Sequence, residues 1–230
     1  MNPTISVIIP AHNEENYIKK TLHSLKNQTY QNYEAIVVAN GCTDNTEQIV
    51  NKRVNERLRL LSLPKANVSV ARNAGALNAQ GSILLFLDAD TTLANNALKQ
   101  IKEQFTENYS VATTLVKPDE DKLKFNLAMK FKNFYLRTKL YEGAAGTLIC
   151  RKDDFHKAEG YDPEIIVKEH RKLAIKLKNS GKFCCVNTYA TTSMRRFKQW
   201  SLTKATSFWI QQWFKDKFSN LKDTKYESIR

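Results

Sequence analysis

The sequence contains little glycine, proline or cysteine, and it has no long hydrophobic run. Seven glycines and five prolines occur among 230 residues, and no stretch is of low complexity, so a folded chain is expected. No stretch approaches the roughly 18 apolar residues that a membrane-spanning helix requires. The apolar run Ile5–Ile9 is too short for a signal peptide and lacks a basic leader. We therefore expect a cytoplasmic protein, with any membrane contact peripheral and at the inner face.

Cysteine is also scarce, and its spacing does not fit a metal centre. The four cysteines are Cys42, Cys150, Cys184 and Cys185, and none of them belongs to a C-x-x-C pair. The neighbours Cys184 and Cys185 point to opposite faces if they lie on a strand. This pattern argues against a zinc site and favours reduced thiols in a cytosolic protein.

Acidic residues are outnumbered by basic ones. The 36 lysines and arginines against 23 aspartates and glutamates give a formal net charge of +13. Such a surface attracts polyanions, which include nucleotide diphosphates, anionic lipid headgroups and nucleic acid. The alternative is a solvated basic surface without a specific partner. Because no helix-turn-helix, zinc-finger or RNP pattern occurs, we expect no specific nucleic-acid partner.

Strand-like and helical patterns alternate through the first half of the chain. Strands are predicted at Ile5–Ile9, Ala35–Ala39, Leu58–Leu63 and Ser82–Leu87. Helices are predicted at Glu14–Gln28, Thr43–Asn55 and Val68–Ala79. This alternation predicts an α/β fold with a mostly parallel sheet that is flanked by helices.

The second half is less regular, and no linker divides the chain. Helices are predicted at Leu93–Thr106, Lys122–Tyr141, Glu169–Asn179 and Leu202–Phe218. Strands are predicted at Val111–Leu115, Thr147–Cys150 and Phe183–Asn187. We expect one domain over residues 1–200, with a nucleotide half (1–92) and a helical acceptor half (93–200). Residues 201–230 are expected to form an amphipathic, basic and aromatic helix.

Polar clusters follow three of the predicted strands. They begin at Pro10, at Asn40 and at Asp88. Ligands of open parallel sheets bind outside the carboxyl ends of the strands, so these clusters are expected to share one crevice.

Asp88 and Asp90 form a D-x-D triplet directly after an apolar strand. Residues i and i+2 of an extended segment point the same way, so both carboxylates face one spot and repel each other unless a cation lies there. Hard divalent cations such as Mn²⁺ or Mg²⁺ take carboxylate and phosphate oxygens. The alternative is a pair of aspartates that cap a turn or the following helix.

The arrangement as a whole resembles the family 2 glycosyltransferases over roughly residues 4–200. The matching segments are SVIIPAHNEE, IVVANGCTDNT, the A-R-N-x-G segment at Val70–Gly75, ILLFLDAD, Gly160–Asp162 and Glu169–His170. The resemblance implies a GT-A fold and a donor pocket for a UDP- or GDP-sugar.

The resemblance also implies roles for individual residues around the donor. Pro10, Ala11 and Glu14 would line the nucleoside, and Asn40 replaces an aspartate that commonly contacts the base. Arg72 would lie near the base and the diphosphate, where its planar fork suits phosphate oxygens.

Glu169 and His170 match the acceptor-side E-D segment of the family, in which the aspartate usually serves as the general base. Here histidine stands at that position. An inverting transfer needs one base that deprotonates the acceptor hydroxyl. Either Glu169 or His170 is therefore the candidate catalytic base, and a third possibility is that neither acts and Glu169 only caps a helix.

The segment Thr192–Phe197 resembles a T-S-x-R-R-[FW] motif that closes the site in some subgroups of the family. By that analogy Arg195 and Arg196 bind the donor diphosphate, and Trp200 lies beside the acceptor. The alternative is a basic rim with an aromatic anchor.

Two basic stretches rich in aromatics, residues 122–141 and 208–222, resemble helices that lie on a bilayer surface. The alternative is that their aromatic residues pack on the domain core. Membrane-surface contact is the partner that we favour for these stretches.

These features together predict a metal-dependent enzyme that transfers a sugar from a nucleotide-sugar donor to a hydroxyl acceptor, a glycan or a lipid-linked one, with inversion. The alternative is a catalytically silent nucleotide-sugar-binding subunit of a glycosyltransferase complex, which the histidine at position 170 permits.

Overall fold

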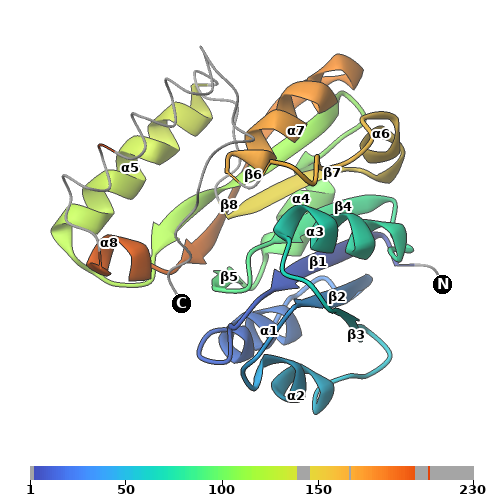
Figure 1. The fold of residues 1–230 in the computed structure, drawn as a ribbon. Helices are drawn as coiled ribbons and strands as arrows, with labels where there is room; N and C mark the ends of the chain where they lie inside the picture. The colour runs from blue at the N-terminus through green and yellow to red at the C-terminus, as the bar shows by residue number, and fades with distance from the viewer. Residues whose placement is uncertain (1–2, 139–145, 166, 200–206, 208–230) are drawn as a thin grey trace.

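Eight strands form one mixed sheet in the order β3-β2-β1-β4-β7-β6-β8-β5, and helices cover both of its faces (Figure 1). The structure is a computed structural model, and it describes residues 3–138, 146–165, 167–199 and 207. Strands β1 to β4 supply one end of the sheet, and strands β5 to β8 supply the other.

The strands of the first half are parallel, as the sequence predicts. β1 (Ile5–Ala11) pairs with β2 (Tyr33–Asn40) and with β4 (Ile83–Leu87), while β3 (Leu58–Leu63) pairs with β2 at the edge. The carboxyl ends of these strands therefore meet at the same edge of the sheet, where polar side chains follow them.

The second half mixes both strand directions. β7 (Thr147–Arg151) is antiparallel to β4 and to β6 (Tyr109–Pro118). β6 is parallel to β8 (Lys182–Thr192), which in turn pairs antiparallel with the short β5 (Thr91–Leu93). The predicted α/β fold is confirmed, with its parallel part confined largely to the first half.

Two hydrophobic clusters lie on opposite faces of the sheet. One face is covered by α1 (Ile18–Lys26), α2 (Thr46–Asn51) and α4 (Ala97–Gln104). The other is covered by α3 (Val68–Leu77), α6 (Lys152–Lys157) and α7 (Glu169–Leu177), the last followed by a short 3₁₀ turn, Lys178–Ser180. Because both faces are covered, the central strands are apolar at successive positions rather than at alternate ones.

A third, smaller cluster joins the two remaining helices. Phe125, Met129 and Leu136 of α5 (Leu123–Arg137) are buried beside Val116 of β6, together with Met194, which directly precedes α8 (Arg195–Gln199). In Figure 1, α5 lies on the far side of the molecule from α2 and β3. None of the helices in the described ranges is both long and apolar enough to cross a membrane.

Gly75 fixes how closely α3 approaches the sheet. A Cβ atom at this position would lie 2.4 Å from Cγ2 of Ile8, so any side chain would push the helix away from β1. The helix begins at the cap residue Asn67, whose side chain accepts a hydrogen bond from the Val70 amide (3.0 Å). Cap and glycine together set the position of Arg72, one turn into the helix.

Several helices are shorter than predicted: α1 begins at Ile18 instead of Glu14, and α2 spans Thr46–Asn51 instead of Thr43–Asn55. The helix expected at Leu93–Thr106 begins only at Ala97, because residues 91–93 form β5 and the Ala94 amide donates to the Tyr189 carbonyl (3.0 Å). Two β-branched threonines open this segment and suit an edge strand, which the helical pattern of the following residues obscured. The helix predicted at Leu202–Phe218, and the 201–230 unit with it, lie outside the described residues.

A buried carboxylate, Glu34 on β2, ties the first strands together away from the crevice. It accepts hydrogen bonds from Ser6 Oγ (2.6 Å), from the Gln80 amide (2.6 Å) and from Arg59. Burial alone would raise the pKa of Glu34, but these hydrogen bonds outweigh it and lower the pKa below its ordinary value. The ionised form therefore stabilises the fold above the ordinary pKa of a glutamate.

Replacing Glu34 with Gln is expected to lower the free energy of unfolding at pH 7 by about 2 kcal/mol, because a charge-assisted network is lost. The difference from wild type should shrink as the pH falls through the lowered pKa of Glu34, where the native carboxylate becomes protonated as well. Urea unfolding at several pH values measures both effects. Glu56→Gln, at an exposed position, is the matched control and should change stability by less than about 0.5 kcal/mol. A difference that does not depend on pH would contradict this account.

Candidate functional site

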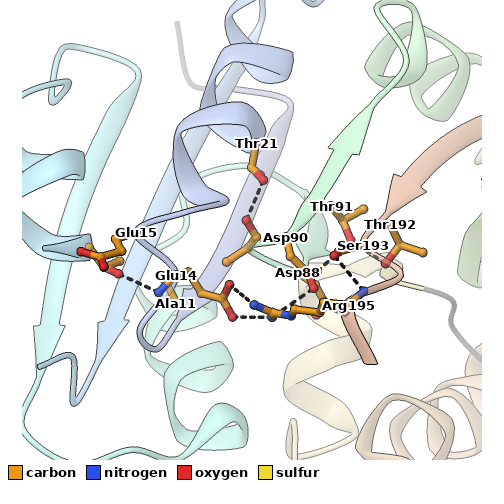
Figure 2. A network of polar contacts seen from close by, with 12 residues as sticks. Ala11, Glu14, Glu15, Thr21, Asp88, Asp90, Thr91, Thr192, Ser193 and Arg195 are labelled. Carbon is orange, nitrogen blue, oxygen red and sulfur yellow. Dashed lines mark hydrogen bonds and ion pairs between the residues drawn. The ribbon is translucent and has the colours of Figure 1, made fainter. Parts of the chain in front are cut away.

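The D-x-D triplet lies where β4 ends, and its backbone is held on both sides. The Asp88 amide donates to the Gly146 carbonyl (3.2 Å), and Thr21 Oγ1 donates to the Ala89 carbonyl (2.7 Å). The Thr91 amide donates back to the Asp88 carbonyl (3.0 Å). These bonds fix the turn that carries Asp88 and Asp90 (Figure 2).

Arg72 on α3 neutralises two carboxylates at once. Its Nη1 donates to Glu169 Oε1 (2.7 Å), and its Nη2 donates to Asp88 Oδ1 (2.9 Å). The guanidinium also lies over the ring of Tyr161, 5.3 Å from the centroid. The side chain is only 3% exposed, and the charge is retained because the two carboxylates raise the arginine pKa against the cost of burial.

Arg195, at the start of α8, likewise bridges two carboxylates. Its two terminal nitrogens donate to both carboxylate oxygens of Glu14 (2.8 and 2.7 Å), and Nη2 lies 3.1 Å from Asp90 Oδ2. Figure 2 shows this arginine between Glu14 and the aspartates. Its guanidinium also lies 4.7 Å from the centroid of the Tyr17 ring. Arg195, near the end of the described chain, thus connects the loop after β1 to the turn after β4.

The negative charge is concentrated at Asp90. Burial raises the pKa of Asp90 to about 6, the nearby Asp88 and Glu14 carboxylates contribute in the same direction, and Arg195 opposes them. The carboxylate is therefore ionised at neutral pH at a cost in free energy. A further cation at this position would lower that cost.

His170 on α7 is enclosed beside Asp88. Its Nδ1 lies 2.7 Å from the Tyr161 hydroxyl, and its Nε2 lies 4.0 Å from Asp88 Oδ1. Burial, together with the positive charges of Arg72 and Lys132, holds the pKa of His170 well below its ordinary value. The imidazole is therefore neutral at pH 7, and its buried Nε2 makes no hydrogen bond to any residue that the structure describes.

Three other candidates lie at the ends of β1 and β2. Pro10 and Ala11 are buried at the end of β1, and the Ala11 carbonyl accepts a hydrogen bond from Cys42 Sγ (3.3 Å). Asn40 is also buried, and its Oδ1 accepts from the Asn67 amide (2.7 Å) at the cap of α3. The side-chain oxygen of Asn40 thus holds α3 in place in this structure.

The remaining two candidates cannot be described. Trp200 lies outside the described residues, and Arg196 belongs to α8 but its side chain does not belong to the described part. The D-x-D aspartates, Arg72, Arg195 and the acceptor-side pair are brought together, with Glu14 beside them.

Asn73 is a structural residue of the site that the sequence analysis did not single out, although it belongs to the A-R-N-x-G motif. Its Nδ2 donates to the Tyr161 carbonyl (2.8 Å), and its Oδ1 accepts from the Tyr161 amide (2.9 Å). Gly160 has a positive φ of 65°, and a Cβ atom there would meet Asn73 Oδ1 at 2.8 Å. The clamp holds Tyr161 beside both Arg72 and His170.

The described side chains can hold a divalent ion only together with oxygen atoms from a bound ligand. Within the described residues no three Asp, Glu, His or Cys side chains are grouped as a complete metal site. Asp88 and Asp90 offer two neighbouring carboxylates. Burial and the charges of Asp88 and Glu14 raise the pKa of Asp90, while Asp88 is 37% exposed and paired with Arg72. Ions such as Mg²⁺ are commonly held by one or two carboxylates together with substrate phosphates, so these residues fit that arrangement.

The chain is similar in sequence to proteins named as glycosyltransferases or glycan synthases. A glycosyltransferase of Haemophilus influenzae without assigned specificity is 36% identical over 114 residues, which are 48% of this chain and 46% of that protein. The chondroitin synthase of Pasteurella multocida is 28% identical over 194 residues, which are 80% of this chain and 20% of the synthase. The chain thus spans less than half the length of these relatives.

Solved structures extend the similarity to the fold. S. aureus TarS, solved in complex with UDP-GlcNAc, has a TM-score of 0.66 at 23% identity, covering 82% of this chain and 58% of that one. A mannosyltransferase from Pyrobaculum calidifontis, solved with GDP-Man and Mn²⁺, has a TM-score of 0.71 at 17% identity, covering 92% and 65%. The expected GT-A fold is confirmed. The model of the family described as "Glycosyl transferase family 2" matches residues 6–158, two thirds of the chain, and the chain therefore belongs to that family.

Proposed function

We propose that the protein transfers a sugar from a UDP- or GDP-sugar to a hydroxyl acceptor, with inversion at the anomeric carbon and with the help of a divalent metal ion. The observation that carries the proposal is the convergence of Asp88, Asp90 and Arg72 at the carboxyl end of β4, with Glu169 beside them. This is the place where an open sheet binds a nucleotide. The nucleotide-sugars bound in the TarS and mannosyltransferase structures support the choice of donor.

In this proposal the two arginines hold the donor diphosphate. Each guanidinium presents planar donors that match phosphate oxygens, and each is largely buried (3% and 18% exposed), which strengthens its electrostatic attraction. Arg195 can exchange its contact with Asp90 for a phosphate oxygen while it keeps its two bonds to Glu14. Pro10, Ala11, Glu14 and Asn40 remain the proposed walls of the nucleoside pocket, and Arg196 and Trp200 are retained as proposed diphosphate and acceptor contacts.

Asp88 and Asp90 would hold Mn²⁺ or Mg²⁺ together with diphosphate oxygens. The ion supplies positive charge that stabilises the leaving diphosphate. The elevated pKa of Asp90 supports this role, because the site has an excess of buried negative charge when no ion is present.

Glu169 is the proposed base. Its side chain is 15% exposed and only one of its oxygens is bound to Arg72, so the other can accept a proton. His170 is a poorer candidate because its ring is enclosed, its Nδ1 is bound by Tyr161, and a proton on it would face Arg72 and Lys132. We propose that His170 stays neutral and is a structural residue beside Asp88, and that it does not act as the base.

The step that follows is a single displacement. The acceptor oxygen forms a bond to the anomeric carbon on the face opposite the diphosphate, and its proton passes to Glu169. The bond between the anomeric carbon and the diphosphate oxygen breaks, and its electron pair leaves with the diphosphate. We also propose a cytoplasmic location, which the free thiols of the four cysteines support.

A second candidate function is a silent subunit that binds the nucleotide-sugar without turnover. It is favoured by one observation, the enclosed histidine at the position where the family pattern has its base. Assays of transfer and of donor hydrolysis across a broad acceptor panel separate the two. Donor binding without either reaction would support the silent subunit.

Replacing Asp90 with Asn is expected to lower metal-dependent transfer by at least about a hundredfold, because an ion ligand next to the developing charge is lost. The raised pKa of Asp90 means that its ionised form costs stability at neutral pH, and that this cost falls as the pH drops from about 6 toward 3.8. Without added metal, the Asp90→Asn variant should therefore have a melting temperature no lower than that of wild type at pH 7. Asp153→Asn, at an exposed position on α6, is the matched control for both assays. Turnover like that of wild type with Mn²⁺ would contradict the metal assignment.

Replacing Glu169 with Gln is expected to lower kcat by about 10²- to 10⁴-fold, because the proton acceptor is removed. Nucleotide binding, measured by calorimetry, should change far less, since Gln can still accept a hydrogen bond from Arg72. His170→Asn is the companion variant and should retain most of the turnover. The reverse ranking of the two variants would assign the base to His170.

A further inference from the structure

Four large apolar side chains lie exposed in a row along α5. They are Leu123 (76% exposed), Leu127 (55%), Phe131 (64%) and Phe134 (58%), and we call them the α5 stripe. Their spacings of four, four and three residues place them on one face of the helix. An aligned set of leucines and phenylalanines differs from the single exposed apolar residues that are normal on a surface.

The stripe is not the face by which α5 joins the domain. That face is formed by Phe125, Met129 and Leu136, all buried in the third cluster. Asn133 adds two hydrogen bonds of 2.8 Å to the backbone amide and carbonyl of Val116 on β6. The helix therefore has two apolar faces, and only one of them is used within the described domain.

Basic side chains border the stripe. At 3.6 residues per turn, Lys130 and Arg137 lie along one border and Lys124 along the other, and all three are exposed. No acidic residue occurs within α5. The aspartates and the glutamate that precede the helix are engaged locally, with Glu120 paired to Lys122 and Lys198.

We propose that the α5 stripe is a docking surface for an anionic lipid bilayer. Leucine and phenylalanine enter the boundary between headgroups and acyl chains, while the bordering lysines and arginine reach the phosphates. Charge complementarity favours this occupant over a second copy of the chain, which would bring two basic faces together. It also disfavours residues 201–230 as a cover, since they carry six lysines and arginines against three acidic residues.

The same helix connects this surface to the donor site. Lys132, on the inner side of α5, is electrostatically coupled to both Asp88 and His170. Phe125 packs near Phe197 of α8, the helix that Arg195 begins, with the ring centroids 6.5 Å apart. A bilayer at the stripe would therefore lie on the opposite side of α5 from these contacts. The docking surface goes beyond the proposed sugar transfer and is tested without any donor.

The test is flotation of the chain with vesicles of phosphatidylcholine alone and of phosphatidylcholine mixed with phosphatidylserine. We expect binding to the mixed vesicles, weakened by salt. The double variant Phe131→Ser, Phe134→Ser should lower the partition at least about tenfold, because two large apolar side chains no longer enter the bilayer. Lys130→Gln should lower it about fivefold.

Leu77→Ser, on α3, is the matched control because Leu77 is 75% exposed and lies far from the stripe in sequence. It should leave the partition unchanged, and all variants should melt within a few degrees of wild type. Unchanged vesicle binding by the double variant would overturn the proposal. An equal loss of vesicle binding in Leu77→Ser would also overturn it. So would a wild-type chain that binds no vesicles but forms a dimer, if the double variant converts that dimer to a monomer.

Discussion

Two largely buried arginines hold the candidate site together, and each bridges carboxylates that the chain brings from distant positions. Arg72 joins Asp88 to Glu169, and Arg195 joins Glu14 to Asp90. Glu14 is buried, and leaving its carboxylate without a counter-charge would cost several kcal/mol. The pairings therefore determine how the two halves of the domain meet around the crevice.

In the proposed function, the arginines also suit the site to a diphosphate. An arrangement in which every negative group has a positive partner needs no ligand, but here Asp90 keeps a raised pKa in spite of Arg195. The site has more buried negative charge than its arginines fully compensate. An incoming cation and a diphosphate can enter together, because the ion adds charge at Asp90 while the phosphate oxygens satisfy the arginines.

The sequence predicted the parts of the site that depend on short-range pattern. Asp88 and Asp90 were predictable because they follow an apolar strand at a spacing of two, and Arg72 because it belongs to a recognisable motif on a helix. The bidentate pair of Glu14 and Arg195 was not predictable, since 181 residues separate its members and no local pattern links them. The bond from Asn40 to the cap of α3 and the strand β5 depend likewise on tertiary contacts, which override local preference. The two apolar faces of α5 could be identified only from the structure, because the sequence does not show which of its aromatic residues pack in the core.

The central claim is that the carboxylates and arginines of the crevice form a joint site for a metal ion and a nucleoside diphosphate. Thermal unfolding of the chain with UDP or GDP, each with and without Mn²⁺, tests it most directly. The account predicts that one nucleotide raises the melting temperature when Mn²⁺ is present, with a stabilisation of about 2.7 kcal/mol at one hundred times the dissociation constant. An equal shift without the ion, or no shift with either nucleotide, would contradict it.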